Sequence, residues 1–566
     1  MVLPTSPPAS MSVSQILAEF GITAGTTKRI SQDLFPLVGG TAGSTCLLGA
    51  SFSGKSANYP VGYSTFGSTC TGRGIAVDSS KNIYITGNYS SATTVPIRTF
   101  GAAPTASGVS LPATAGGIDA FVIKWNANGT VAGYSTIRGN GNDVGYGIAV
   151  DSSQNIYIAG QYTSTLIVPI NTFGTAPAAS GVNLPASLGT DGFVIKWNAA
   201  GTLAGYSNIR GNSVDIGYGI VVDSSQNIYI TGTYNSTLIV PIRAFGTAPA
   251  LSGVSMPVTT VGDAFVIKWN AAGTLAGYSN IKGNGADQGN AIAVDSSQNI
   301  YITGQYTSGT TVHLNTFGTA PAPSGVIMPA TAGGTDAFVV KWNAAGGAVA
   351  GYAMIRSNGN DIGYGIAVDS SQNIYITGQY VSSAAVAITV FGTFPFASGV
   401  NLPASLGVGF SDVFVIKWNG SNGTVAGYST IRGTDNDIGY GIAVDSSQNI
   451  YIAGQYTSSA TVPINTFGTA PSASGVSMPA SSGAGGDAFV IKWNAAGTLA
   501  GYSRINGNGA DIGYAIAFDS SSNIYVTGNY ISTVIVPINT FGTAPVASGV
   551  SMPVSVNDAF VIKWNA

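Results

Sequence analysis

The chain has 566 residues and a net charge of −3; only 8% of its residues are charged and 78 are glycine. No basic stripe exists to neutralise phosphates, which excludes nucleic acid as an expected partner. The mean hydropathy is +0.29, but no uninterrupted apolar run approaches the ~18–20 residues that cross a bilayer, so no membrane insertion is expected.

Residues 1–60 are unlike the rest of the chain. They contain VLPTSPPASMSVSQILAEFG, RISQDLFPLVG and SFSGKS, with neither a basic segment nor an apolar h-region, so no secretory signal is expected. SVSQILAEFG predicts one short helix that begins at Ser12 or Ser14 and ends at Gly21. The other pieces are too small to form a core alone, so we expect residues 1–60 to dock on the rest of this chain or on another protein.

These N-terminal phrases resemble a short module found at the starts of phage and large-virus structural proteins. The resemblance covers about a tenth of the chain and carries no chemistry. It implies that residues 1–60 attach the protein to other virion or tail subunits. It also implies synthesis in the host cytoplasm and a location at the virion surface.

From residue 61 onward the chain repeats itself. VGYSTFG at 61–67 comes first, and DSSQNIYI or a close variant then begins at seven aspartates, while all seven tryptophans lie in FVIKWN or FVVKWN, 71–76 residues apart. Periods of this size indicate stacked supersecondary units. The aspartates are Asp78, Asp151, Asp223, Asp295, Asp369, Asp445 and Asp519, and the tryptophans are Trp125, Trp197, Trp269, Trp342, Trp418, Trp493 and Trp564.

Each repeat predicts four short strands, of the types GIAVD, NIYITGQY, FVIKW and GYSTIRG. DSSQN predicts a turn between the first two strands, because Asp and Asn side chains bond nearby backbone and tolerate positive φ. FVIKW places Phe, Ile and Trp on one face of the third strand. Four antiparallel strands repeated seven times predict an all-β protein, a seven-bladed β-propeller over residues 61–566.

The order of segments also predicts how the ring closes. The last repeat ends at FVIKWNA, after its third strand, while the GYS strand at 61–67 precedes the first repeat and has no KW strand before it. We therefore expect this N-terminal strand to be the fourth strand of the last blade.

The segments GIAVDSS…NIYITG and DAFVIKWNAAGT…GYS, over about residues 61–566, resemble the bacterial repeat family named for its seven-bladed β-propellers, the SBBP repeats. The resemblance implies the fold and no single activity. The chain departs from the usual repeat by an insert of about 25–30 residues between strands two and three. We expect these inserts and the strand-four-to-one loops to form a crown of neutral loops on one face, suited to glycan or protein contact.

Residues suited to catalysis are scarce. The one histidine, His313, stands in an insert where other copies have proline and is interpreted as a loop substitution, and the one glutamate, Glu19, lies in the predicted helix. No Ser/His/Asp or Cys/His arrangement exists away from His313, so neither an enzyme nor a cofactor is expected. Cys46 and Cys70 either stay reduced or clip the N-terminal segment to the first repeat.

Aspartates recur in three series, of which the DSSQN series forms turns. The second series opens strand three and is expected to pair with the KW lysine or to cap a turn: Asp119, Asp263, Asp336, Asp487 and Asp558. The third series, between strands four and one, is expected to ring the mouth of the channel, where it forms Asx turns or holds Ca²⁺ through carboxylate oxygens. Its members are Asp143, Asp215, Asp287, Asp361, Asp437 and Asp511, with Cys70 at that place in the first repeat.

Five repeats place a tyrosine in the strand that should line the channel. Such a ring would either stack on sugars or pack between blades. The tyrosines are Tyr146, Tyr218, Tyr364, Tyr440 and Tyr514.

These features favour a non-enzymatic virion structural protein, a tail, fibre or capsid-surface component that displays the propeller for host attachment or decoration. Its expected partners are other virion subunits through residues 1–60 and a host-surface glycan or protein. The alternatives are a polysaccharide-active propeller enzyme and an extracellular adhesion or scaffold protein.

Overall fold

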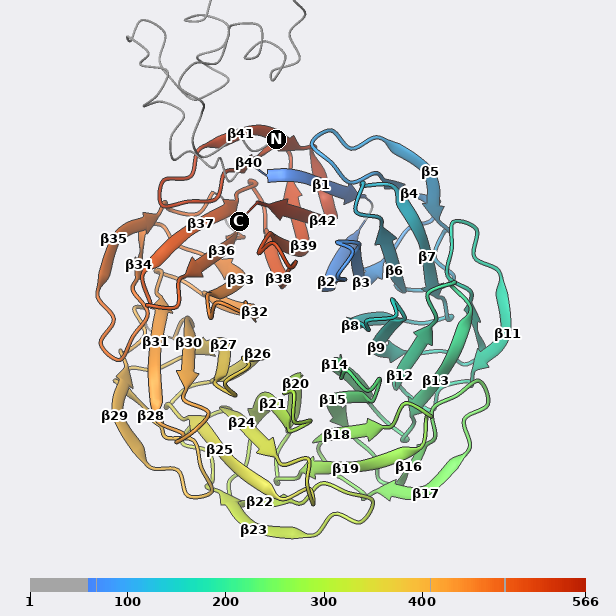
Figure 1. Cartoon of the computed structure of the whole chain (residues 1–566), viewed down its shortest axis with the longest axis horizontal. Helices are drawn as coiled ribbons and strands as arrows, with labels where there is room; N and C mark the ends of the chain where they lie inside the picture. The colour runs from blue at the N-terminus through green and yellow to red at the C-terminus, as the bar shows by residue number, and fades with distance from the viewer. Residues whose placement is uncertain (1–59, 68, 408, 483–484, 566) are drawn as a thin grey trace, which may run out of the picture. The chain divides into compact units, whose positions relative to one another are not determined.

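Seven blades of four antiparallel strands surround a central channel (Figure 1), and in two of them the sheet continues into the hairpin of the next blade, with six strands in all. This computed structural model describes residues 60–67, 69–407, 409–482 and 485–565. The helix predicted at residues 12–21, together with Glu19 and Cys46, lies outside the described residues. Those residues form strands and turns without a helix, and so none long and apolar enough to span a membrane. The predicted seven-bladed propeller is confirmed.

The innermost strand of each blade faces the channel (Figure 1). It is the short, glycine-led GIAV segment, and it pairs only with the second strand of its own sheet. From blade one to blade seven these strands are β2 (Cys70–Val77), β8 (Val144–Val150), β14 (Asp215–Val222), β20 (Gln288–Val294), β26 (Ile362–Val368), β32 (Ile438–Val444) and β38 (Ile512–Phe518).

The second and third strands form the centre of each blade, and almost every side chain in them is buried because neighbouring blades cover both faces. The second strands are β3 (Ile83–Tyr89), β9 (Ile156–Tyr162), β15 (Ile228–Tyr234), β21 (Ile300–Tyr306), β27 (Ile374–Tyr380), β33 (Ile450–Tyr456) and β39 (Ile524–Ser532). The third strands are β6 (Asp119–Trp125), β12 (Asp191–Trp197), β18 (Asp263–Trp269), β24 (Asp336–Trp342), β30 (Asp412–Trp418), β36 (Asp487–Trp493) and β42 (Ser555–Trp564).

The fourth strand of the last blade comes from the start of the described chain. β1 (Pro60–Phe66) runs antiparallel to β42, with Tyr63 opposite Ile562 and Phe66 opposite Ala559, which confirms the predicted closure. The fourth strands of blades one to six are β7 (Val131–Ile137), β13 (Leu203–Ile209), β19 (Leu275–Ile281), β25 (Val349–Ile355), β31 (Val425–Ile431) and β37 (Leu499–Ile505).

The expected crown of loops is not what the inserts form. Each insert folds into a two-stranded hairpin at the outer edge of the ring (Figure 1). Each hairpin reaches the fourth strand of the preceding blade, as where Tyr206 of blade two pairs with Gly246 of blade three through hydrogen bonds of 3.0 and 3.1 Å. This pairing recurs at all seven junctions and occupies part of the outer edge of every blade, an edge that would otherwise be open to another chain. The hairpins are β4 (Val95–Arg98) with β5 (Ala106–Leu111), β10 (Val168–Asn171) with β11 (Ala179–Leu184), β16 (Val240–Arg243) with β17 (Leu251–Met256), β22 (Val312–Asn315) with β23 (Pro323–Met328), β28 (Val386–Thr389) with β29 (Ala397–Leu402), β34 (Val462–Asn465) with β35 (Ala473–Met478), and β40 (Val536–Asn539) with β41 (Ala547–Met552).

The hydrophobic core consists of seven clusters, each shared by two adjacent blades. One cluster joins Tyr84 and Val122 of blade one to Ile158, Phe193 and Trp197 of blade two. All seven tryptophans are at most 1% exposed. Each blade therefore depends on its neighbours for the burial of both faces.

The repeated DSSQN turn is an aspartate-centred network. Asp151 Oδ1 accepts the backbone N–H groups of Ser153 and Asn155 at 2.9 Å, and Oδ2 accepts Asn155 Nδ2 at 2.7 Å and the Tyr157 hydroxyl at 2.9 Å. Gln154 takes φ of +62°, the left-handed conformation that closes the turn. The predicted turn role of this series is confirmed, and the near-identity of the copies follows from how many bonds one carboxylate satisfies.

Candidate functional site

The predicted tyrosines do come together around the channel, and β-bulges put them there. In β8, Gly145 and Gly147 pair with consecutive residues of β9, so Tyr146 is the extra residue between them. A bulge turns its extra residue away from the regular alternation of the strand. The same shift recurs in all seven innermost strands, and the seven extra residues, all half-buried, are Arg73, Tyr146, Tyr218, Asn290, Tyr364, Tyr440 and Tyr514.

The tyrosines of this channel ring pack on one another. The ring centroids of Tyr146 and Tyr218 are 4.9 Å apart, and Tyr440 lies 5.1 Å from Tyr364 and 5.0 Å from Tyr514. Arg73 lies between two of them, with its guanidinium carbon 5.2 Å from the Tyr146 centroid and 5.4 Å from that of Tyr514. Each of these arginine–tyrosine cation–π contacts is worth about 0.5–1 kcal/mol at an exposed site.

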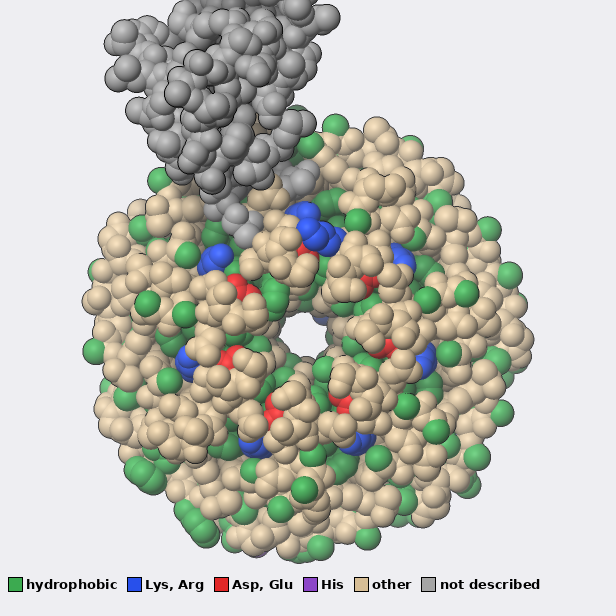
Figure 2. Space-filling view, viewed as in Figure 1, with side chains coloured by type: hydrophobic (Ala, Val, Ile, Leu, Met, Phe, Trp, Pro, Cys, Tyr) green, Lys and Arg blue, Asp and Glu red, His purple; other side chains and the backbone are tan. Residues whose placement is uncertain are grey.

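The mutual contacts of these tyrosines, at interplanar angles of 52–61°, favour packing between blades over sugar stacking. In blade four the ring is completed by Asn290, whose Nδ2 donates to the Gly363 carbonyl at 2.8 Å. Figure 2 shows the channel open through the middle of the ring.

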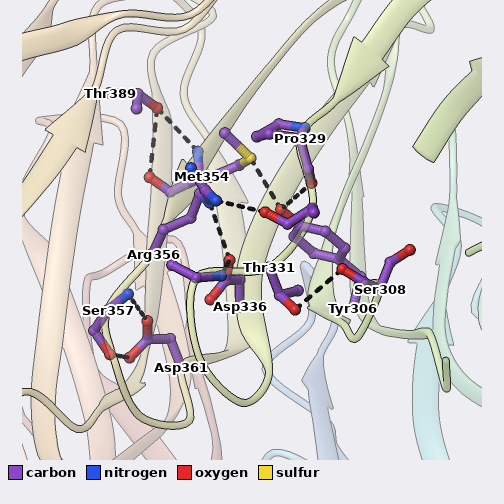
Figure 3. A network of polar contacts seen from close by, with 12 residues as sticks. Tyr306, Ser308, Pro329, Thr331, Asp336, Met354, Arg356, Ser357, Asp361 and Thr389 are labelled. Atoms are coloured by element: carbon purple, nitrogen blue, oxygen red, sulfur yellow. Dashed lines mark hydrogen bonds and ion pairs between the residues drawn. The ribbon is translucent and has the colours of Figure 1, made fainter. Parts of the chain in front are cut away.

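The aspartates of the third series do not line the channel mouth, because all six side chains are at most 1% exposed. Each fastens the strand-four-to-one loop to the end of the second strand. In blade five, Asp361 accepts the Ser357 N–H at 2.6 Å and hydroxyl at 2.7 Å (Figure 3), and the Val381 N–H at 3.2 Å. Asp143 likewise accepts the N–H groups of Gly139 and Thr163. In an Asx turn the side chain bonds the backbone two residues later, whereas these donors lie four residues before and twenty after the aspartate. The predicted Asx turn is therefore wrong.

The same geometry argues against a cation at this series. Both oxygens of each carboxylate already accept N–H groups, and the described residues contain no cluster of three or more His, Cys, Asp or Glu side chains able to hold a metal. Burial raises the pKa of these carboxyls, and the backbone N–H groups only partly offset it. The resulting pKa is about 7 for Asp143, Asp215, Asp361 and Asp511 and about 8 for Asp287 and Asp437.

In five blades the aspartate that opens strand three pairs with an arginine at the end of strand four, which corrects the predicted lysine partner, while Asp263 of blade three lies near Lys282. Asp119 and Asp336 also accept the backbone N–H groups of Ala115 and Ala332, four residues earlier, in keeping with the predicted turn cap. Arg138 Nε lies 3.3 Å from Asp119 Oδ2, and Arg356 Nε lies 3.1 Å from Asp336 Oδ2 (Figure 3). The KW lysine stands at the opposite end of the strand, where Lys124 Nζ lies 4.9 Å from the Tyr84 ring centroid. Burial raises the pKa of Asp119, Asp263 and Asp336 to about 6, and it raises that of Asp487 as well.

His313 and Cys70, which the sequence analysis considered individually, both lie in strands of the fold. His313 belongs to strand β22, not to a loop, and its side chain is exposed at the place where other hairpins have proline. Cys70 is buried at the start of β2, and its Sγ lies 3.7 Å from the Gly67 carbonyl. Burial raises the pKa of its thiol well above the ordinary range. A clip to Cys46 concerns a residue outside the described part of the chain.

The blades differ from one another at the outer surface of the hairpins, here called the hairpin rim. The sequence analysis did not identify this surface. Two residues before each first hairpin strand differ between copies. They are exposed aliphatic pairs in blades two, three and seven, and Thr or Ala in the other four blades. The pairs are Leu166 and Ile167, Leu238 and Ile239, and Val534 and Ile535, each residue 52–64% exposed. Blade five adds Phe394 at 83% and Phe396 at 67%.

The repeats of this chain are similar to those of a known propeller family. A family model for the beta-propeller repeat SBBP matches residues 63–88, 274–309, 351–379 and 498–529. An uncharacterised WD repeat-containing protein of Acanthamoeba polyphaga mimivirus is 24% identical over 465 residues, 74% of this chain and 32% of its own length. This chain therefore spans about a third of that relative.

A solved structure of the Dos1 propeller aligns over 90% of this chain and 95% of its own, with 8% identity and a TM-score of 0.34. Four segments of the chain thus match the beta-propeller repeat SBBP, and the described residues fold as seven four-stranded blades.

Proposed function

We propose that this protein is a non-catalytic recognition propeller displayed on a virus particle, with the hairpin rim as its contact surface for the host. The observation that carries the proposal is the placement of exposed apolar side chains. Phe394 and Phe396, together with the aliphatic pairs, lie on the rim, while the repeated parts of the blades are buried. Exposed apolar groups on an otherwise rigid, weakly charged surface are typical of contact sites.

The carboxylates favour recognition over catalysis. Those of the third series are held by backbone N–H groups, and those at strand three by arginine in five blades, so both series have structural partners. The same arrangement recurs from blade to blade, whereas an active site needs one blade that differs from the others. The rim does differ between blades, and several weak contacts on one rigid ring would add through multivalency.

Attachment to a particle is the second part of the proposal and is supported by the sequence. The phrases in residues 1–60 resemble a module of viral structural proteins, and a relative of the repeats is encoded by a giant virus. Fusing residues 1–60 to an unrelated reporter should carry the reporter onto particles. A reporter that stays unbound would remove the docking role from this segment.

Host recognition is tested with the full chain on the surface of host cells. Binding should fall in the variant Phe394→Ser/Phe396→Ser, because these are the most exposed aromatic side chains of the rim. A matched control changes two exposed aliphatic residues outside the hairpins, Val554→Ser and Val556→Ser, which lie two residues apart around the start of β42. Particle association without any affinity for cells would replace recognition by decoration of the particle.

A further inference from the structure

Two hollows on the outer wall each lie between the fourth strand of one blade and the hairpin of the next. One, of about 200 Å³, is lined by Ile167, Tyr206, Asn208, Arg210 and Arg243 at the junction of blades two and three. The other, of about 250 Å³, lies at the junction of blades seven and one and is lined by Tyr63, Thr65, Arg98 and Ile535 among others. Both are smaller than the roughly 300–1,000 Å³ pockets that hold drug-sized ligands, so each fits a compact unit.

Two of the arginines that line these hollows, Arg98 and Arg243, are cations that the scaffold does not use. Among the described residues, seven lysines stack on tyrosines, five arginines form ion pairs and Arg73 lies between two tyrosines. Lys81 bonds the Ser521 hydroxyl, and Lys282 bonds the Val258 carbonyl beside Asp263. Within the same ranges, Arg98 and Arg243 contact neither a carboxylate nor an aromatic face.

The fold needs the backbone of position 243 but not its side chain. The Arg243 carbonyl accepts Trp269 Nε1 at 2.7 Å and the Ser207 hydroxyl at 3.3 Å. The same two bonds form where the corresponding residue is asparagine, as at Asn171. Arg243 itself makes one side-chain hydrogen bond, from Nη1 to the Pro249 carbonyl at 3.3 Å.

The junction of blades two and three brings two guanidinium groups into one hollow. Arg210 is balanced by Asp191, whose Oδ2 lies 3.3 Å from Arg210 Nε; burial raises the pKa of Asp191 to about 6, which leaves it ionised at neutral pH. Arg243 has no such counter-charge, and its charge partly offsets the burial that raises the pKa of Tyr206. The hollow therefore carries one uncompensated positive charge, and arginine binds carboxylates with paired, charge-assisted hydrogen bonds.

The other residues that line the hollow determine which kind of carboxylate ligand fits it. The phenol ring of Tyr206, the amide of Asn208 and the exposed aliphatic side chain of Ile167 offer an apolar face beside polar groups. Sugar rings present the same mixture of C–H faces and hydroxyls. A peptide cannot add as a strand here, because Tyr206 already exchanges both backbone hydrogen bonds with Gly246.

We propose that this hollow binds the carboxylate-bearing sugar unit of an acidic glycan, with Arg243 as the residue that holds the carboxylate. The proposal names a ligand class for the rim and so rests on the proposed function, but its test uses the purified chain without cells. The probes are the methyl glycosides of N-acetylneuraminic acid and glucuronic acid, which represent the two common sources of such a carboxylate. Methyl glucoside is the neutral control.

Saturation-transfer NMR and calorimetry on the full chain should show binding of at least one sugar acid, weakened by added salt, and no binding of the glucoside. Arg243→Asn should weaken binding at least about tenfold, which is about 1.4 kcal/mol. It should fold normally, because Asn171, Asn315, Asn465 and Asn539 occupy this position in other blades. Arg98→Asn is the matched control and should leave this affinity unchanged, because Arg98 lines the other hollow, which has no second guanidinium among its described lining residues. Ile167→Thr, a change at an exposed side chain, should weaken binding without unfolding.

Equal binding of the neutral glucoside, an unchanged affinity in Arg243→Asn, or no binding of either acid would overturn the proposal. Binding of a glutamate-rich peptide but not of either sugar would also overturn it. The result separates cleanly from the proposed function. A chain that attaches to cells but binds no sugar acid would support the proposed recognition function and contradict this ligand class. A chain that binds a sugar acid but does not attach to cells would contradict the recognition of cells.

Discussion

The blades and the hairpin rim repeat with the same period, but the buried tyrosines and tryptophans of the second and third strands are the same in every copy, whereas rim residues differ between copies. Tyr157 of the second strand, its six counterparts and all seven tryptophans are buried between blades and never vary. The two residues ahead of the hairpin, Leu166 and Ile167 in blade two, become Thr or Ala in four other blades. The difference teaches that contact with two neighbouring blades restricts a residue, and that exposure at the rim leaves it free to serve a partner.

The largest effect should follow from breaking the ring itself. Deletion of residues 61–67 removes β1, so the last blade loses its fourth strand and the β42 edge is exposed. It also removes buried Phe66 and Tyr63. We expect a loss of roughly 5 kcal/mol or more in the free energy of unfolding, measured by denaturant titration.

A rescue variant serves as the control for that deletion. Appending Ala-Gly-Thr and then residues 60–67 after Ala566 rebuilds the WNAAGT turn and the spacing that link strands three and four in other blades. Most of the lost stability should return. A deletion that melts like the full chain would contradict closure by β1.

A smaller effect should come from pH acting on the buried carboxyls of the blades. Burial, with contributions from Asp412 and Asp435, raises the pKa of Asp437 to about 8 from an ordinary value of 3.8, so the folded state binds the proton more tightly. Stability is then complete below about pH 4 and is lost as pH rises toward 8. We expect the melting temperature, followed by calorimetry, to fall from pH 5 to pH 8.

Asp437→Asn separates titration from hydrogen bonding. The amide cannot ionise, so this variant should lose less stability between pH 5 and pH 8 than the native chain. At pH 5 it should be less stable by about 1–3 kcal/mol, because its NH₂ opposes one of the N–H groups of Gly433 and Thr457. Stability that rises with pH in the native chain would show that these carboxyls fold in the ionised form.

The smallest effect should be found on the rim. Leu238→Thr/Ile239→Thr changes side chains that are 62% and 63% exposed and should shift the free energy of unfolding by less than about 0.5 kcal/mol. The same change at buried Ile230 should cost about 2–4 kcal/mol, because it leaves a void and buries a hydroxyl. Equal costs at the two sites would erase the distinction between blade and rim.

Much of the fold could be predicted from the sequence because each repeat spells out its strands and turns. The period, the DSSQN turn and the unpaired GYS strand were enough to predict seven blades and their closure. The channel tyrosines were also placed correctly, since the innermost strand must face the channel.

What could not be predicted depends on contacts between repeats. The bulge at Tyr146 and the pairing of Tyr206 with Gly246 leave no mark in the local pattern. The partner of Asp119 was wrong because Lys124 is close in sequence, whereas Arg138 is close in space. Arg243 looks like any insert residue until its hollow with Arg210 is seen, although its difference from the asparagine in four other copies was a usable signal.

The pairing of each hairpin with the preceding blade has a consequence for the order in which this protein folds during synthesis. β1 waits for a partner strand about 500 residues later in the chain, since Pro60 lies opposite Trp564. Ribosomes add about 5–20 residues per second, so that partner emerges roughly 25–100 seconds after β1. Tyr63 nevertheless exchanges hydrogen bonds of 2.9 and 3.1 Å with Gly101, which emerges within seconds. The first hairpin can therefore hold the closing strand on the nascent chain until the last blade arrives to meet it.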